Sequence, residues 1–184
     1  SRYDVHELLR QFAAEKLSEN EALETAVRER HSLYYCELLQ QHTPNWHTAR
    51  QRDTLVDVTR EASNIQVAWD YALEHEAWQR LQEAIDSWGF YHQWRGLREH
   101  GERFCQAICS QLEHWVTTNP AGTAAGYHLS AKAMTWYGVF TSDTRIAALR
   151  LRQSLGMLAH SKLAEADTRT IEAFALLSLG HTLT

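Results

Sequence analysis

The chain has 184 residues, of which 44% are hydrophobic and 22% charged, a balance typical of a folded globular protein rather than a disordered one. It carries only two prolines and eight glycines, whereas an all-β sandwich or barrel needs many turn residues. The formal net charge of -5 argues against direct nucleic-acid binding, because neutralising phosphates requires clustered Lys and Arg.

Helical patterns follow one another along the chain. They predict helices over residues 4–18, 21–41, 50–75, 77–94, 97–116 and 123–140, then a seventh after Asp143 and an eighth from about Ala166. Asp4 and Asp143 are N-cap candidates, and Gly96 suits the left-handed position that ends the fourth helix. No segment alternates with period two for long enough to be a strand. We therefore expect an all-α fold.

Apolar residues at steps of three and four predict the face that each helix buries. In the first three helices these are Val5, Leu8, Leu9, Phe12, Ala13 and Leu17; Leu23, Ala26, Val27, Leu33, Tyr34 and Leu38; and Leu55, Val58, Ala62, Ile65, Trp69 and Ala72. In the last two they are Ile146, Leu149, Leu151, Leu155 and Leu158, then Ile171, Phe174, Leu177 and Leu179.

The later helices come in pairs joined by tight turns. The turns at Gly96 and Ser142 lie 46 residues apart, which suits helix pairs like those of tetratricopeptide repeats (TPR) but with longer helices. One pair cannot bury its own apolar face, so neighbouring pairs must stack. The expected architecture is a set of stacked antiparallel helix pairs in a TPR-like right-handed superhelix. The eighth helix begins a third pair, so we expect a repeat region truncated at its C-terminus, either cut from a larger protein or covered by another chain.

Five segments carry a resemblance to one family of signalling proteins. They are YDVHELLRQFAAEKL at 3–17, AVRERHSLYY at 26–35, EASNIQVAWDYAL at 61–73, WRGLREHGERF at 94–104, and Leu179-Gly180. In this order they resemble the helices that close the winged-helix/NB-ARC module of STAND-type ATPases and the TPR-like region after it. The chain is similar to that part of large bacterial transcriptional regulators of the LuxR or antibiotic-regulator type.

The resemblance implies both a domain division and a function. Residues 1–45 would be the end of the winged-helix/NB-ARC module and its linker, and 46–184 the repeat region. The function implied is a non-catalytic sensor that receives a protein, peptide or small effector on its concave face and passes the event to an upstream ATPase module. ATP or ADP would bind on that upstream module and no cofactor on this chain, which has no G-x-x-x-x-G-K-[ST] phosphate loop.

His6 is the position to which family chemistry transfers. In the Met-His-Asp motif of these ATPases the histidine approaches the ADP phosphates, and here the motif is Val5-His6-Glu7. The resemblance therefore implies nucleotide sensing by His6 in the full-length parent only. In this chain alone, His6 is expected to be an exposed residue of the first helical turn.

Aromatic residues gather near the ends of the first helices of two pairs. Such helices line the concave face of a stack, where rings offer a large contact area to a ligand. The candidate ligand-binding residues are Trp88, Tyr91, Trp94, Arg95, Trp136 and Tyr137. Packing of the rings in the helix-to-helix core is the alternative interpretation, with one or two rings left exposed. Arg95 and Arg98 beside the Gly96 turn are candidate anion partners or parts of a solvated helix end.

Other classes of site find less support. Cys105 and Cys109 lie one turn apart without further ligands at a familiar spacing, and the eleven histidines are dispersed, so no metal site is expected and the cysteines are interpreted as buried apolar residues. No catalytic motif is present, so we expect no enzyme.

The chain also has no secretory signal and no apolar run of about 18 residues, so a cytoplasmic protein without a membrane span is expected. An oligomerisation scaffold, or a small-molecule enzyme on a helical array, stays open as the alternative function.

Overall fold

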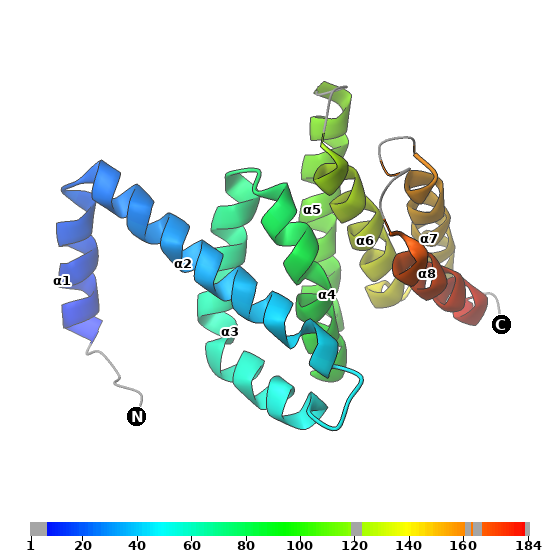
Figure 1. Ribbon diagram of the computed structural model, residues 1–184, viewed down its shortest axis with the longest axis horizontal. Coiled ribbons are helices and arrows are strands. Elements are labelled where there is room, and N and C mark those ends of the chain that lie inside the picture. Colours follow the sequence, from blue (N-terminus) through cyan, green and yellow to red (C-terminus); the bar gives the residue numbers. More distant parts are fainter. Residues whose placement is uncertain (1–6, 119–122, 161–162, 164–166, 183–184) are drawn as a thin grey trace.

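The computed structural model describes residues 7–118, 123–160, 163 and 167–182, and that part of the chain is folded into helices without a strand (Figure 1). In chain order the elements are α1 (Glu7–Ser18), α2 (Glu21–His42), the short 3-10 helix η1 (Thr43–Asn45), α3 (Gln51–Glu74), α4 (Trp78–Trp94), α5 (Arg98–Thr118), α6 (Ala124–Phe140), α7 (Thr144–Leu158) and α8 (Arg169–Thr182). The all-α prediction is confirmed. None of these helices combines the length and apolarity that crossing a bilayer requires.

Local chemistry sets the helix ends. The Asp143 carboxylate accepts hydrogen bonds from the backbone N–H groups of Arg145 (2.8 Å) and Ile146 (3.2 Å), which caps α7 as predicted. Asn20 caps α2 in the same way through the N–H of Leu23. Gly96 has a φ of 69°, so it takes the left-handed conformation after α4 that a residue with a Cβ rarely adopts. The predicted cap at Asp4 lies outside the described residues.

The helices are arranged as a repeat. The first helices of successive pairs lie next to one another, α2 against α4, α4 against α6, and α6 against α8. The second helices α3, α5 and α7 each pack on the first helix of the following pair. Figure 1 shows the result as a row of helices in which successive pairs follow one another from α2 to α8.

Large aromatic side chains fill the space between the pairs. The largest fully buried residues include four tryptophans, Trp46, Trp69, Trp88 and Trp136. One continuous core extends from α2 to α6, and a smaller one joins α6, α7 and α8 around Tyr127, Leu158 and Ile171. The predicted face of α3 is confirmed, since Val58, Ile65, Trp69 and Ala72 are buried and Leu55 and Ala62 are half-buried.

Gly89 allows α4 and α6 to approach closely. A Cβ built on Gly89 would overlap the indole of Trp136, so any side chain there would force the tryptophan to move. The glycine is thus a packing requirement of the α4–α6 contact rather than a turn.

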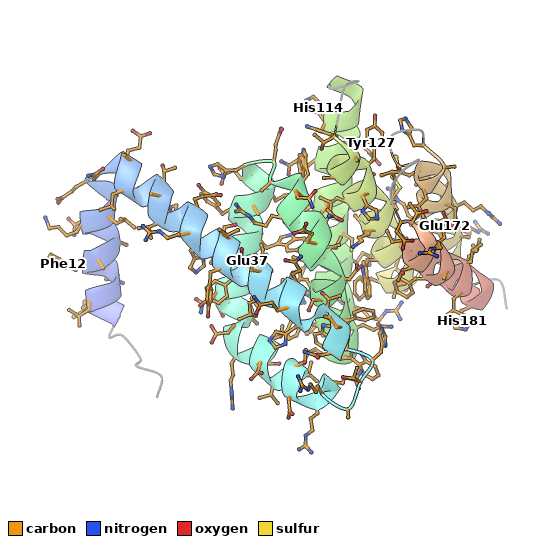
Figure 2. The ribbon with its side chains drawn as sticks, in the orientation of Figure 1. Phe12, Glu37, His114, Tyr127, Glu172 and His181 are labelled. Carbon is orange, nitrogen blue, oxygen red and sulfur yellow. The ribbon has the colours of Figure 1, made fainter. Side chains whose placement is uncertain are left out.

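The predicted buried faces of α1 and α2 are wrong. Leu8, Leu9 and Phe12 on α1 are exposed, as are Leu23, Ala26, Val27, Leu33 and Tyr34 on α2, while Leu17 and Leu38 are half-buried. The buried residues of α2 are Ser32, Cys36 and Leu39. Figure 1 gives the physical reason for the residues up to Val27, because α1 and the first half of α2 extend away from the other helices and have no core to face. Figure 2 shows Phe12 on this N-terminal arm, here defined as residues 7–28. Leu33 and Tyr34 lie in the packed half of α2, where Ser32, Cys36 and Leu39 form the buried face instead.

The apolar stripes of the last two helices are buried in part. On α7, Leu151 and Leu158 are buried and Leu155 is half-buried, but Ile146 and Leu149 are exposed. On α8, Ile171 is buried, Phe174 and Leu179 are half-buried, and Leu177 is exposed. The main neighbours of α7 and α8 are α6 and each other, so no further helix of the described residues covers the outer part of these stripes.

Candidate functional site

The candidate site is an aromatic groove of about 630 Å³ formed by the first helices α4, α6 and α8 together with η1 and the loop after it. Its lining residues are Thr43, Pro44, His47, Asp86, Phe90, Gln93, Trp94, Lys132, Thr135, Trp136, Thr170, Ile171, Ala173, Phe174 and Leu177. Most of its walls are apolar, and its volume lies within the range of roughly 300–1,000 Å³ typical of small-molecule pockets.

Interlocking rings shape the groove. Phe90 on α4 lines it, with the ring centroids of Trp136 at 4.9 Å and His47 at 4.7 Å, both edge to face. Phe174 on α8 adds a further lining ring, 5.1 Å from Trp136. The 3-10 helix is held beside α4 because the Trp46 indole N–H donates to the buried Ser87 hydroxyl at 2.7 Å. The groove therefore has walls fixed by packing.

An ion pair lies among the apolar residues of the groove. The Lys132 ammonium on α6 donates to the Asp86 carboxylate on α4 at 2.6 Å and to the backbone carbonyl of Gln82 at 2.8 Å. The other oxygen of Asp86 accepts the indole N–H of Trp136 at 3.0 Å. The pair is largely shielded, with side-chain exposures of 12% for Lys132 and 27% for Asp86. One turn before Lys132, burial and the nearby ammonium lower the pKa of His128, partly offset by Asp86.

A second hollow of about 420 Å³ continues the groove along α8, past Phe174 and Leu177 toward His181. Arg98 borders it from α5 and donates to the backbone carbonyls of Phe140 (3.2 Å) and Thr141 (3.0 Å). The guanidinium of Arg98 thus caps the C-terminal end of α6, which favours a structural role over anion binding.

The structure disperses the six predicted ligand-binding residues. Trp94 is 53% exposed at the edge of the groove, and the buried Trp136 forms one of its walls. Trp88 and Tyr91 are buried in the core and stack on each other at 4.9 Å. Tyr137 is also buried, with the Arg150 guanidinium of α7 5.0 Å from its ring centroid.

The remaining predicted residues lie apart from the groove. Arg95 is exposed at the end of α4 and does not line it. His6 lies outside the described residues. Of the six, only Trp94 and Trp136 meet in one site, and core packing accounts for Trp88, Tyr91 and Tyr137.

The sequence analysis does not predict Asp86, Lys132 or His47 as residues of the groove. It predicts Phe174 as part of a buried helix face and not as a residue of a ligand site. A signal for some of them was present. Asp86, Phe90 and Trp94 are spaced by four, as are Lys132 and Trp136, so each set lies on one face of its helix. Phe174 and His47 line the same groove only because tertiary contacts bring their segments to α4 and α6.

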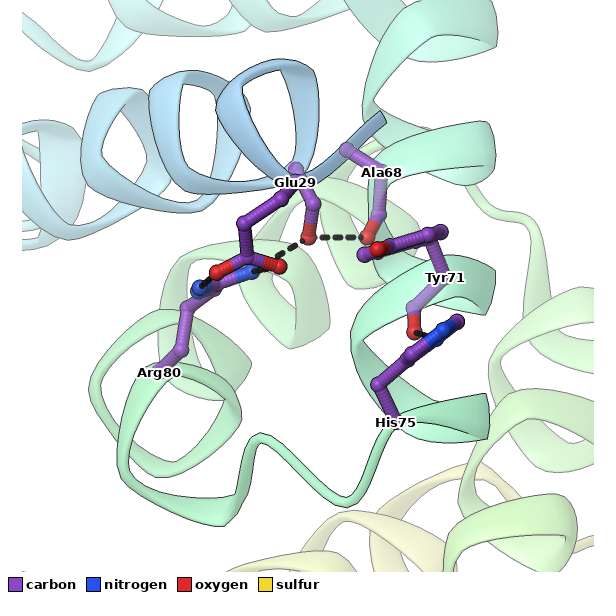
Figure 3. A network of polar contacts seen from close by, with 6 residues as sticks. Glu29, Ala68, Tyr71, His75 and Arg80 are labelled. Atoms are coloured by element: carbon purple, nitrogen blue, oxygen red, sulfur yellow. Dashed lines mark hydrogen bonds and ion pairs between the residues drawn. The ribbon is translucent and has the colours of Figure 1, made fainter. Parts of the chain in front are cut away.

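A polar network at the base of the N-terminal arm fastens α2 to the other helices (Figure 3). The Arg80 guanidinium on α4 pairs with the Glu29 carboxylate on α2 and donates to the Ser32 hydroxyl at 2.9 Å, which in turn donates to the Ala68 carbonyl of α3 at 2.8 Å. The hydrogen bond from Arg80 is the main reason why the pKa of Glu29 is lowered. The arm therefore leaves the body just before Glu29.

The three cysteines are buried and free, as predicted. Burial raises the pKa of Cys36 to about 11 and that of Cys109 to about 12, and raises that of Cys105 as well. Such thiols stay protonated and are weak nucleophiles. Among the residues that the structure describes, no three His, Cys, Asp or Glu side chains gather as a metal site would require.

Two other hollows suit an apolar ligand less well, the first because its rim is polar and the second because it is smaller. One of about 560 Å³ between α2, α4 and the start of α6 has a polar rim that includes Glu37, Glu83 and Arg80. One of about 250 Å³ lies between α3 and α5. Comparisons of the chain with protein-family models, with curated proteins and with solved structures find no match.

Proposed function

We propose that this chain is a non-catalytic recognition and sensor module of a signalling ATPase that regulates transcription. The observation that carries the proposal is the aromatic groove, since it is a preformed and mostly apolar concavity of the size of ordinary ligand pockets. The groove would receive the effector or partner, and the upstream module would bind ATP or ADP.

The contacts of the first helices support a TPR-like right-handed superhelix as the architecture of residues 46–184. In such a stack the first helices line the concave face, and the groove is built on α4, α6 and α8, which occupy that position. Three free cysteines fit the reducing cytoplasm as the place where the module works.

The N-terminal arm, rather than all of residues 1–45, is the part that would contact the upstream module, because α2 from Glu29 onward packs with α3 and α4. Phe12 is 58% exposed and Leu9 61% exposed on a helix whose contacts are with α2. A helix of 12 residues is marginal by itself in water, so an apolar face of this size favours contact with a further module. The resemblance of residues 3–17 to the last helices of a winged-helix/NB-ARC module makes the ATPase the natural candidate.

A sensor of this kind works by shifting a population. A ligand in the groove changes the ATPase only if it binds more tightly in one arrangement of the two modules than in the other. The N-terminal arm, fastened by Arg80 at its base, is the element that would carry the difference.

Reading the encoded sequence upstream of Ser1 is the first test of the proposal. It should reveal a phosphate-binding loop, and the lack of one would contradict the proposed class.

The release of ADP from the parent protein is the second test. In the purified parent, deletion of residues 46–184 should change the release rate of a fluorescent ADP analogue by about fivefold or more, the lower end of ordinary allosteric coupling. Trp94→Ala should change the release rate in the parent, whereas Leu149→Ala, an equally exposed apolar residue on α7, should not. An unchanged rate after the deletion would rule out the sensor role.

The exposed apolar residues of α1 and α8 favour a second candidate, an oligomerisation scaffold. Leu8, Leu9 and Phe12 lie on α1, and Leu176 and Leu177 on α8. Sedimentation equilibrium over a wide range of concentration separates the two functions, because a scaffold would self-associate. A monomer at the highest concentration would exclude the scaffold.

A further inference from the structure

We propose that the aromatic groove binds an uncharged small molecule with an aromatic or polycyclic ring, and that the Asp86–Lys132 pair excludes charged analogues. This inference rests on the groove being the recognition site of the proposed function and specifies its ligand.

The size of the groove suits a compact ligand. Phe90 lies next to His47, with 4.7 Å between the ring centroids, and next to Phe174, with 6.3 Å between them. The loop after η1 and helix α8 thus both pack against the same ring of α4. The groove of about 630 Å³ that they help to line accommodates a molecule of two to four fused rings, which is within the roughly 300–1,000 Å³ of ordinary ligand pockets.

The charges in the groove cancel. Among its described lining residues Asp86 and Lys132 are the only formally charged ones, and they pair with each other at 2.6 Å. A charged ligand would lose its hydration without gaining a free counterion, which is costly, whereas an uncharged ligand avoids that loss. The hollow beside α2 differs, because Glu37, Glu76 and Glu83 accompany Arg80 in its lining.

Rings already present show what a bound ring would meet. Phe90 meets Trp136 edge to face with an interplanar angle of 88°, and Trp136 meets Phe174 at 63°. Trp136 itself is fully buried, so a ligand ring would pack at about 4.5–7 Å from the centroids of the half-buried Phe90 and Phe174 and extend the same favourable arrangement. Trp94, half-exposed at the edge, would lose its exposed area as the ligand enters.

Asp86 also offers a place for one hydroxyl group of the ligand. An ionised carboxylate accepts about four hydrogen bonds, and those from Lys132 and Trp136 account for two. A ligand hydroxyl could donate to a remaining lone pair without disturbing the ion pair. The inferred ligand is thus a neutral ring compound with at most a few polar groups.

Three probes with the same ring and different charge test the inference on the 184-residue chain. They are naphthylmethanol, naphthoate and naphthylmethylammonium, titrated by isothermal calorimetry. Naphthylmethanol should bind at least about tenfold more tightly than either ion, a difference of about 1.4 kcal/mol. Equal affinities, tighter binding of an ion, or no binding of naphthylmethanol would each overturn the inference.

Two substitutions test the role of the ion pair. Asp86→Asn keeps an acceptor for Trp136 but leaves Lys132 uncompensated, so the affinity for naphthoate should rise by about fivefold or more while that for naphthylmethanol changes little. Lys132→Met should favour naphthylmethylammonium in the same way. If neither variant changes the preference among the probes, the pair does not set the selectivity and the inference fails.

The location of binding is tested separately. Phe174→Ala should weaken naphthylmethanol binding by about fivefold or more, and Leu149→Ala should leave it unchanged. Equal effects of the two variants would place the probe outside the groove and contradict the inference.

If no probe binds but Trp94→Ala still alters ADP release in the parent, a macromolecular partner occupies the groove, and the sensor proposal stands without this ligand. If naphthylmethanol binds as expected but deletion of residues 46–184 leaves ADP release in the parent unchanged, the sensor proposal fails and the ligand inference stands.

Discussion

His92 is a buried histidine held neutral by the core. Its ring lies against Trp88 and Phe104 at 4.5 and 5.1 Å, and its Nδ1 hydrogen-bonds the Trp88 carbonyl at 2.8 Å. Burial lowers the pKa of His92 from 6.5 to about 4, although the bond to Trp88 opposes the shift. Nothing in its sequence surroundings distinguishes it from the other ten histidines, because burial depends on the helices packed around it.

This pKa predicts a loss of stability in mild acid. As the pH falls below 6.5, the unfolded chain takes up the proton first, so the free energy of unfolding decreases progressively until about pH 4 and is unaffected above 6.5. The full loss is about 3 kcal/mol. Urea unfolding of the wild type and of His92→Phe, at about pH 7 and about pH 4, measures it. The variant should lose less stability on acidification, and equal losses would contradict a buried neutral His92.

Gly89 gives a second prediction for a single residue. Gly89→Ala would overlap the Trp136 indole, and we expect it to destabilise the fold by about 1–3 kcal/mol, as overpacked core sites do. Gly156 on α7 is the control, because a Cβ there meets open space. Gly156→Ala should stabilise the helix by about 0.5–1 kcal/mol. Chemical denaturation compares them, and a Gly89→Ala variant as stable as the wild type would show that α4 and α6 are not this close.

Among the helices, α3 and α2 show when an apolar pattern predicts a buried face. The apolar steps of three and four in α3 predict its buried face correctly, because Val58, Ile65 and Trp69 meet neighbouring helices along its length. In α2 the same reasoning failed, since its first half extends beyond the body and Arg80 anchors it only from Glu29 onward. A pattern states which residues are apolar, and the presence of a neighbour decides whether they are buried.

The exposure of α1 predicts that its apolar residues contribute little to stability in this chain. Phe12→Ser should change the free energy of unfolding by less than about 0.5 kcal/mol, as surface substitutions do. Phe104→Ser, at a buried ring of α5, should cost about 3 kcal/mol or more. Thermal or chemical unfolding of both variants tests the difference. A loss above about 1 kcal/mol for Phe12→Ser would mean that α1 packs on the other helices.

For the whole molecule, the positions of the tryptophans give a direct test of the packing. All seven lie in the described part of the chain, and Trp94 is the exposed one, since the others are at most 7% exposed. Trp94→Phe should therefore remove most of the fluorescence that acrylamide quenches at low concentration. Quenching that persists in the variant would show that further indoles reach the solvent. The fluorescence that remains in Trp94→Phe should come from the buried indoles.

The repeat also determines which distant residues meet. Asp86 and Lys132 are 46 residues apart, the same spacing as the turns at Gly96 and Ser142, and Phe90 and Trp136 share it. Equivalent positions of successive helix pairs thus lie side by side in α4 and α6. The spacing was visible in the sequence, but the pairing of Asp86 with Lys132 required knowing that first helices pack on first helices.

The sequence by itself determined the helices and their caps at Asp143 and Gly96, because these depend on local spacing and composition. It also marked the cysteines and one face of α3 as apolar, but their burial came from the helices packed around them. The tertiary structure decided which aromatic rings became core and which became groove. Trp88 and Trp94 lie six residues apart on one helix, yet one is covered by neighbouring helices and the other is exposed. Burial is a property of what surrounds a residue, and only the packed chain supplies those surroundings.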